Sequence, residues 1–422
     1  MRKPLIIFVL VALFIGFSCD TEEPDGIFDP NTTAAPDPVI TSVTPPDSAY
    51  GAADTRSTVT IVGENFGDNA DEVIVNFGSK KATIISHSAT QMVVTPPANF
   101  TDSLRVMVSK YGSNAAYEFG VYEDASGEFH PYKLLNPISE IAGFDAYKLP
   151  QSVCVDNAGN VFSTHDRVIE KVSPDGIITN VGELRGKTTT RLLVGPDGAL
   201  YYTYSKNIMK VDTVTYSQHT YKKLNESSLD MAFDVNDNLY AIDAHNIYSV
   251  DASTMEPTEL MTFNADFPDT TLITMRIYNN DLYLAGNISY QTGEVKRYVW
   301  KVTLDVTTGT LNGDISEVFD WSESEDYDDI NITNITFDSN GVMLVGSSNH
   351  AIVQIDPAGG AYSTGSVTKM YADLLGDKYI HRFFWGPDNY LYISTYNISD
   401  TENARLLKVN MFGTGAPYYG RN

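Results

Sequence analysis

Short runs of alternating apolar and polar residues cover most of the chain after residue 38 and predict β-strands. Between residues 38 and 122 these runs include 39–43, 58–62, 73–77, 91–95 and 104–108, with turn residues between them. Period-two alternation interrupted by turn residues is typical of an antiparallel sandwich. We therefore predict an all-β protein whose first domain, residues 38–122, is a β-sandwich.

One unit recurs six times between residues 130 and 411. It consists of an apolar strand, a tight turn of Asp, Asn and Gly, a second apolar strand, a polar loop and a third strand. The second strands of the six units lie at 161–163, 200–202, 239–241, 282–284, 343–345 and 391–393. Repeats of about 40 to 60 residues, each a small sheet, pack as blades around an axis. This pattern predicts a six-bladed β-propeller over residues 130–411.

The two ends of the repeat region suggest how the propeller closes. The sixth unit ends after Asn410 without room for a fourth strand, whereas residues 132–141 are strand-like and precede the first unit. Adding this segment to the last blade would remove an exposed sheet edge. Residues 412–422 would then form a C-terminal tail packed on the outside.

The N-terminus has the pattern of a secretory signal. Arg2 and Lys3 precede an unbroken apolar run at 5–14, and small residues lie just before Cys19. The run is too short for a membrane span, and no later stretch approaches 18 consecutive apolar residues. The ending resembles a bacterial lipoprotein signal, which implies that residues 1–19 are a signal peptide with Cys19 as the lipidated residue. The alternative is ordinary signal cleavage beside an incidental cysteine.

Residues 20–37 are acidic at first and then rich in Pro, Thr and Ala, the composition of a solvated tether. The acidic run at 20–25 resembles the export signal of Bacteroidetes surface lipoproteins, which implies a location at the cell surface, lipid-anchored in the outer membrane. Alternatively, the linker is acidic only because the whole chain is.

Composition narrows the possible partners. The 54 acidic residues exceed the 28 basic ones by 26, giving a net charge of −26 that repels phosphate backbones, so we expect no nucleic-acid partner. Two cysteines exclude a disulfide scaffold and a zinc site built on paired cysteines. Cys154 falls in an apolar strand and is predicted to be a buried core residue.

Four segments of the first domain match successive signatures of one module. They read Ile-Thr-Ser-Val-Thr-Pro at 40–45, Gly-Glu-Asn-Phe-Gly at 63–67, Val-Asn-Phe-Gly at 75–78 and Ala-Thr-Gln-Met-Val-Val-Thr-Pro-Pro at 89–97. Together they resemble the immunoglobulin-like IPT/TIG domain, which implies a spacer role, with direct binding as the alternative. The repeats at 130–411 resemble NHL-repeat propellers.

Aligning the six units on their first strands places polar residues at one equivalent position. These residues are Ser152, Arg191, Asp230, Asn334 and Arg382, with the fourth unit ambiguous between Thr274 and Arg276. First strands line the axis of a propeller and begin at one face, so these side chains are predicted to form a polar ring at the mouth of the central channel. Convergent polar groups in a concavity are the usual form of a small-ligand site.

Loops expected on the same face add aromatic, basic and acidic side chains. Those that we predict to stand around the mouth include His165, Lys206, His245, Tyr290, Trp321 and Tyr396. Aromatic rings beside carboxylates and amides suit carbohydrate, whose C–H faces stack on rings while its hydroxyls need donors and acceptors. The acidic loop at 320–329 could instead hold Ca²⁺, but it lacks the glycine and spacing of a calcium loop. We therefore expect no cofactor, with calcium as the weaker alternative.

Enzymatic functions are less well supported by the sequence. Six-bladed relatives include calcium-dependent lactonases similar to gluconolactonase and lyases that hold zinc through histidines. The aligned ring has a single carboxylate, Asp230, among Ser, Arg and Asn residues and could not make a carboxylate-rich calcium site, and the seven histidines show no metal-ligand spacing. No nucleophile elbow is present. We therefore predict a protein that is not an enzyme, leaving an unrecognised hydrolase or lyase as the least favoured alternative.

These features lead to one functional prediction. The chain resembles accessory surface lipoproteins of Bacteroidetes that capture glycans beside an outer-membrane transporter. We predict that the propeller mouth binds an oligosaccharide or polysaccharide, with Arg191, Asp230, Asn334 and Arg382 as polar contacts and Tyr290, Trp321 and Tyr396 as stacking surfaces. The alternative is protein recognition, in cell adhesion or within a surface complex.

Overall fold

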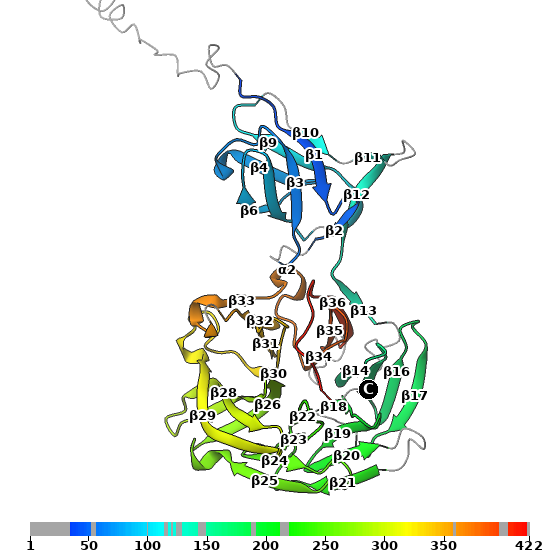
Figure 1. Cartoon of the computed structure of the whole chain (residues 1–422), viewed down its shortest axis with the longest axis vertical. Helices are drawn as coiled ribbons and strands as arrows, with labels where there is room; N and C mark the ends of the chain where they lie inside the picture. Colours follow the sequence, from blue (N-terminus) through cyan, green and yellow to red (C-terminus); the bar gives the residue numbers. More distant parts are fainter. Residues whose placement is uncertain are drawn as a thin grey trace, which may run out of the picture.

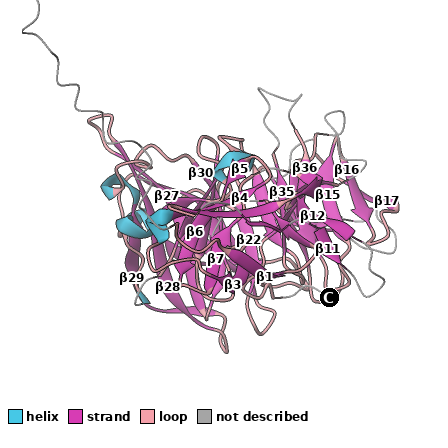
Figure 2. Ribbon diagram, turned by 90° about the horizontal axis from the view of Figure 1, so that it is seen from above, coloured by secondary structure: helices cyan, strands magenta, loops and turns pink. Residues whose placement is uncertain are grey.

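The computed structural model describes residues 34–51, 56–98, 100–113, 117–119, 121–123, 129–141, 149–186, 191–211, 219–357, 360–395 and 404–419. The signal segment with Cys19 and nearly all of the tether lie outside these ranges. Figure 1 shows a smaller N-terminal domain joined to a larger wheel of strands, and Figure 2 shows that helices are few and short. None of the helices in the described ranges has the length and apolarity needed to cross a membrane.

The N-terminal domain is a sandwich of two four-stranded sheets. One sheet has the order β1 (Val39–Thr44), β3 (Val59–Glu64), β7 (Gln91–Thr95), β6 (Thr83–His87), and the other β10 (Tyr117–Phe119), β9 (Val106–Lys110), β4 (Val73–Phe77), β5 (Lys80–Lys81). Buried residues alternate along β3 and β4, as the sequence predicts, because alternate side chains face the core. Gly63 is required in β3, since a Cβ there would lie 1.9 Å from the carbonyl oxygen of Val39.

A third small sheet completes this domain. In it β12 (Phe129–Leu135) pairs in parallel with β2 (Ser48–Tyr50) and antiparallel with β8 (Thr101–Leu104) and β11 (Val121–Glu123). Tyr132 and Leu134 are buried in the sandwich core. The sequence analysis assigned this segment to the propeller, and the structure corrects that boundary: β12 packs with the first domain because its apolar residues face that core.

The propeller consists of six four-stranded antiparallel sheets within the described residues. From the axis outward, blade 1 is β14 (Ser152–Val155), β15 (Val161–His165), β16 (Val168–Val172), β17 (Ile178–Glu183); blade 2 is β18 (Leu192–Val194), β19 (Leu200–Tyr204), β20 (Asn207–Val211), β21 (His219–Lys223); and blade 3 is β22 (Asp230–Phe233), β23 (Leu239–Ile242), β24 (Asn246–Val250), β25 (Pro257–Thr262).

In the same order, blade 4 is β26 (Thr270–Tyr278), β27 (Asp281–Ser289), β28 (Val295–Asp305), β29 (Thr310–Asp320); blade 5 is β30 (Ile332–Phe337), β31 (Met343–Ser347), β32 (Ile352–Ile355), β33 (Val367–Lys369); and blade 6 is β34 (Arg382–Trp385), β35 (Tyr390–Ser394), β36 (Leu406–Asn410), β13 (Ile138–Glu140). The predicted fold class is confirmed. Cys154 is fully buried in β14, also as predicted.

The recurring Asp of the tight turns has a structural function. One carboxylate oxygen of Asp156 accepts hydrogen bonds from the backbone N–H groups of Ala158 and Asn160, at 3.0 and 2.8 Å. Asp234 and Asp338 make the same pair of bonds in blades 3 and 5. Asp and Asn favour turns because their short side chains can satisfy nearby backbone groups. The repeated turn sequence therefore marks the junction of the first and second strands.

Blade 6 closes the wheel with a strand from the other end of the repeat region. Strand β13 pairs with β36, Ile138 opposite Val409, so the outer strand of this blade precedes blade 1 in the chain. The Nδ1–H group of His381 donates to the carbonyl of Gln151 at 2.6 Å, which joins blade 6 to blade 1. Burial, reinforced by the charge of Arg382, lowers the pKa of His381 to about 3.

The C-terminal segment lies inside the propeller. The ring of Tyr418 stacks on Phe384, with centroids 3.9 Å apart, and its hydroxyl shares a 2.9 Å hydrogen bond with Thr336. The guanidinium of Arg276 lies 3.5 Å from the centre of the same ring. These partners come from the first strands of blades 6, 5 and 4, so the segment, red in Figure 1, fills the axial channel. The prediction that the tail packs on the outside is wrong, because Tyr418 finds its partners at the axis.

The N-terminal domain contacts blades 5 and 6. Arg56 donates to Gln354 at 2.9 Å and lies 3.7 Å from Asp338, while the ring of Tyr50 meets Phe412 edge-on at 5.0 Å. Asp338 follows the first strand of blade 5, and Phe412 follows the third strand of blade 6. The domain therefore lies towards the end of the wheel where the first strands finish.

Replacing His381 should reduce the dependence of stability on pH. The folded-state pKa lies below the ordinary value of about 6.5, so the contribution of neutral His381 is complete above that pH and is lost as the pH falls towards 3. Between pH 7 and 5 the free energy of unfolding should fall by about 2 kcal/mol more in the parent than in His381→Gln. Urea unfolding at both pH values measures this, and equal losses in the two proteins would contradict the assignment.

Removing the ring of Tyr418 should destabilise the propeller. The substitution Tyr418→Ala removes a buried ring from the axis and should lower the free energy of unfolding by about 3 kcal/mol, as for other buried aromatic residues. Tyr290→Ala, which alters an exposed ring, serves as the control and should change stability little. Urea midpoints that are equal for both variants would argue against the tail as a structural plug.

Candidate functional site

The predicted polar ring is present where the first strands of the blades begin. Its members are Ser152, Arg191, Asp230, Thr274, Asn334 and Arg382. The structure resolves the ambiguity in blade 4, since the hydroxyl of Thr274 donates to Asp230, whereas Arg276 lies two residues further and contacts the tail. All six side chains are buried, so the ring lies below the surface of the mouth.

Three of these side chains form a buried chain of contacts across blades 2, 3 and 4. The Nε of Arg191 lies 3.1 Å from one carboxylate oxygen of Asp230, which also accepts from the backbone N–H of Met231. The other oxygen accepts from Thr274 at 2.6 Å and from the backbone N–H of Met275. A buried ion pair persists when further hydrogen bonds satisfy its remaining polar atoms. Both oxygens of Asp230 are thus already engaged, and its main role in this structure is to hold the blades together.

Other ring atoms have no protein partner. Within the described residues, Ser152 Oγ, Arg191 Nη1 and Asn334 Oδ1 are buried and make no hydrogen bond. The guanidinium of Arg191, from blade 2, lies 5.7 Å from the ring centre of Phe384 on blade 6, so it reaches across the axis. Buried polar atoms ordinarily bind protein, water or ligand. The ring therefore offers a donor, an acceptor and a hydroxyl towards the channel.

Arg382 links the buried ring to the surface. Its Nη1 donates to the carbonyls of Thr333 and His381. Burial lowers the pKa of Arg382, while the charge of Asp230 raises it and that of Arg191 lowers it. These opposing effects arise because the three charges face one another around the axis.

A depression of about 520 Å³ lies over this part of the ring. Its walls come from loops of blades 2 and 3 and from the first residues of blade 4, with Arg382 contributed by blade 6. The lining residues are Lys206, Glu226, Ser227, Leu229, Ala244, Thr271, Leu272, Ile273 and Arg382. Sites for small ligands are typically concavities of about 300 to 1,000 Å³ with a few well-placed polar groups. This depression has that size and composition.

The charged groups at its edge are held by hydrogen bonds. Lys206 donates its ammonium to the carbonyl of Asn225 at 2.8 Å. Glu226 lies 2.7 Å from Nδ1 of His245, which places this predicted histidine beside the depression. The sequence analysis missed Glu226 and Ser227, because they lie in a connection between blades whose length varies and which the repeat alignment does not cover.

The remaining predicted residues are not brought to the depression. His165 is nearly buried and lies 3.2 Å from Glu170 within its own blade, and Tyr290 is 40% exposed in the loop between β27 and β28. Trp321 is fully buried, edge-on to Phe319 at 4.8 Å. The prediction that Trp321 is a stacking surface is wrong, since its indole belongs to a hydrophobic core. Tyr396 lies outside the described residues.

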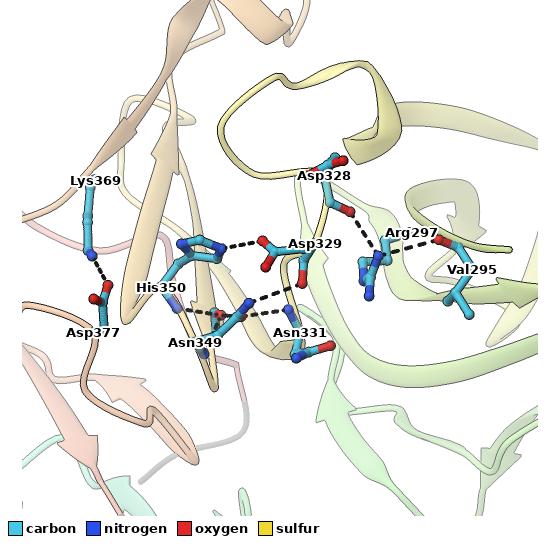
Figure 3. A network of polar contacts seen from close by, with 10 residues as sticks. Val295, Arg297, Asp328, Asp329, Asn331, Asn349, His350, Lys369 and Asp377 are labelled. Atoms are coloured by element: carbon cyan, nitrogen blue, oxygen red, sulfur yellow. Dashed lines mark hydrogen bonds and ion pairs between the residues drawn. The ribbon is translucent and has the colours of Figure 1, made fainter.

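The acidic loop at 320–329 is bound to its neighbours by polar contacts, shown in Figure 3. Arg297 donates to the carbonyl of Asp328 at 2.8 Å, and Nε2 of His350 lies 2.5 Å from the carboxylate of Asp329. The hydrogen bond from His350, opposed by slight burial and reinforced by the nearby charges of His350 and Arg297, lowers the pKa of Asp329. Among the described residues no three His, Cys, Asp or Glu side chains gather as metal ligands. The calcium alternative thus gains no ligand set from this part of the structure.

Breaking the buried ion pair should be costly. Arg191→Met leaves the carboxylate of Asp230 buried without its cation and should lower the free energy of unfolding by about 3 to 5 kcal/mol. Adding Asp230→Asn in the same chain should restore part of that loss, because the unpaired charge is gone. Urea unfolding of the parent, single and double variants measures the coupling. A single variant as stable as the parent would contradict the structural role.

Comparison with known proteins identifies the family of the first domain. Residues 38–121 match the IPT/TIG domain family. No curated protein sequence matches the chain. A solved structure of a protein of unknown function from Bacteroides thetaiotaomicron is 16% identical, with a TM-score of 0.44, and covers 90% of this chain and 99% of that one.

Two further solved structures are similar to this chain. An auxiliary nutrient binding protein from Bacteroides thetaiotaomicron is 12% identical, with a TM-score of 0.47, and covers 90% of this chain and 98% of that one. A gluconolactonase from Xanthomonas campestris is 11% identical, with a TM-score of 0.46, and covers 65% of this chain and 89% of that one. The chain carries an IPT/TIG domain at residues 38–121, followed by a six-bladed β-propeller.

Proposed function

We propose that the protein is a lipid-anchored protein of the outer cell surface that binds an oligosaccharide at the mouth of its propeller. One observation carries this proposal: Arg382, a member of the buried polar ring, also lines the depression of about 520 Å³ beside Lys206 and Glu226. The depression gives a polar ligand room to approach these charged side chains.

The lining of the depression favours a sugar among polar ligands. Ser227 and Glu226 offer hydroxyl and carboxylate groups, while Leu229 and Leu272 offer apolar surface. A sugar needs both kinds of contact, because hydroxyl groups alternate with C–H groups on its ring. Since neither Tyr290 nor Trp321 lines the depression, the aliphatic side chains would take the C–H faces.

The charges favour a sugar that carries a carboxylate. Lys206 and Arg382 contribute two cations to the lining, whereas its one carboxylate, Glu226, is paired with His245. Hydrogen bonds between a guanidinium and a carboxylate are charge-assisted and stronger than neutral ones. An oligosaccharide containing a uronic acid would therefore match this site better than a neutral one.

The placement of the domains supports a spacer function for the IPT/TIG domain. It contacts Asp338, just after the first strand of blade 5, and Phe412, just after the third strand of blade 6. The ring lies at the other end of the wheel, where the first strands begin. An anchor at Cys19, ahead of this domain in the chain, would leave the mouth accessible. Components of an outer-membrane transporter would be the natural recipients of a captured glycan.

Calorimetric titration with neutral and uronic-acid oligosaccharides tests the proposal. The acidic sugars should bind, and Lys206→Met should weaken their affinity at least tenfold, because it removes one cation from the site. Lys222→Met on β21 of the same blade is the matched control, since it removes a lysine away from the depression, and it should leave the affinity unchanged. Absence of binding by every sugar, or equal affinities of both variants, would overturn the proposal.

A further inference from the structure

A second cavity lies between blades 6 and 1, at the end of the wheel opposite the mouth. It encloses about 440 Å³. Its lining residues are Ile141, Asn157, Ala158, Gly159, Val161, Val172, Ser173, Pro174, Gly176, Pro387, Asp388, Tyr392 and Lys408. The equivalent boundary between blades 2 and 3 has the same polar side chains on one side, so the two can be compared directly.

In blade 2 these side chains bind a backbone carbonyl of the next blade. Lys210 lies opposite Tyr201 on adjacent strands, and its ammonium is 2.5 Å from the carboxylate of Asp197. The ammonium of Lys210 and the hydroxyl of Tyr201 both reach the carbonyl oxygen of Ala252 in blade 3, at 3.1 and 3.3 Å. The Asp-Tyr-Lys set is thus a receptor for a peptide carbonyl.

The same loop of blade 3 also supplies an apolar side chain. Met255, three residues after Ala252, is fully buried in the hydrophobic core that includes blades 2 and 3. Its backbone N–H donates to the carbonyl of Asp251, which folds the loop so that the side chain turns inward. One carbonyl and one methionine side chain therefore occupy this boundary.

Blade 6 repeats the polar set without the carbonyl. Lys408 lies opposite Tyr392, and both stand beside Asp388, as in blade 2. Lys408 is 3.8 Å from the carboxylate of Asp388 and 3.9 Å from the ring centre of Tyr390. In the described part of the chain, no carbonyl of blade 1 accepts a hydrogen bond from Lys408 or Tyr392. The hydroxyl of Tyr392 donates to Asp388 at 3.4 Å, and both Lys408 and Tyr392 line the cavity.

Blade 1 also lacks the inserted side chain. Its corresponding loop is a tight turn in which Gly176 donates to the carbonyl of Ser173 at 2.8 Å. Gly176 has a φ of +79°, and no atom lies within 4 Å of the position that a Cβ would take. A glycine in open space thus stands in the loop that in blade 3 carries the buried Met255.

We propose that the cavity between blades 6 and 1 binds a peptide segment of a partner protein. The segment places a backbone carbonyl against Lys408 and Tyr392 and an unbranched apolar side chain, such as methionine, beside Gly176. The internal comparison identifies this ligand, because the same polar set in blade 2 already holds a carbonyl accompanied by a methionine. The site is separate from the mouth and does not depend on the sugar proposal.

Ligand-observed NMR titration of the full chain with N-acetyl-methionine methylamide tests the site. This probe carries the methionine side chain between two amide groups, so it presents backbone-like carbonyls without any other side chain. We expect saturation transfer to the methionine methyl group and at least a fivefold weaker affinity in Lys408→Met. Ala158→Trp, which projects a ring into the cavity from an exposed turn, should weaken binding to the same extent while leaving Lys408 intact.

Two controls separate this site from others. Lys210→Met removes the matching lysine of blade 2, whose carbonyl partner is internal, and Lys206→Met alters only the mouth, so both should leave the affinity for the probe unchanged. Thermal unfolding confirms that each variant is folded. The proposal is overturned if the parent shows no saturation transfer, if Lys408→Met and Ala158→Trp bind like the parent, or if N-acetylglucosamine binds more tightly than the probe.

Discussion

The ion pair between Arg191 and Asp230 is the interaction on which the arrangement of the wheel depends. Two opposite charges removed from water at the axis are tolerated only when each finds enough partners, and those partners come from three different blades. This requirement sets the distance and orientation of blades 2, 3 and 4. In the same ring, Arg191 Nη1 makes no hydrogen bond to the described part of the protein, so the ion pair that joins the blades leaves one buried donor over.

Much of this fold is predictable because the relevant signals are local. The Asp turns and apolar strands of each blade lie within a few tens of residues, so their period reveals the number of blades. The apolar first strands of the six units also identify the ring positions. Residues at the same distance from equivalent buried strand residues must point to the same side of their blades. The sequence also approximately predicts the fourth strand of blade 6, because the sixth unit lacks one and residues 132–141 are strand-like. In the structure only the end of that segment, from Ile138, joins the blade.

The errors concern contacts between segments that are distant in the chain. Trp321 reads as an exposed residue in a polar loop, and only its packing against Phe319 buries it. The tail contains nothing that marks Tyr418 for the channel, because its partners Thr336 and Phe384 come from separate blades. Glu226 approaches the depression through the path of a connection, which no repeat pattern encodes.

The short strand that closes the wheel also has a mechanical consequence. Strand β13, three residues long, is the point at which the chain leaves the first domain and joins blade 6. Because the chain enters blade 6 through this edge strand, a force applied to the first domain would act on the pairing of β13 with β36. The contacts of Arg56 with blade 5 and of Tyr50 with Phe412 also join the first domain to the propeller. They would therefore carry part of the same force and protect the pairing of β13 with β36.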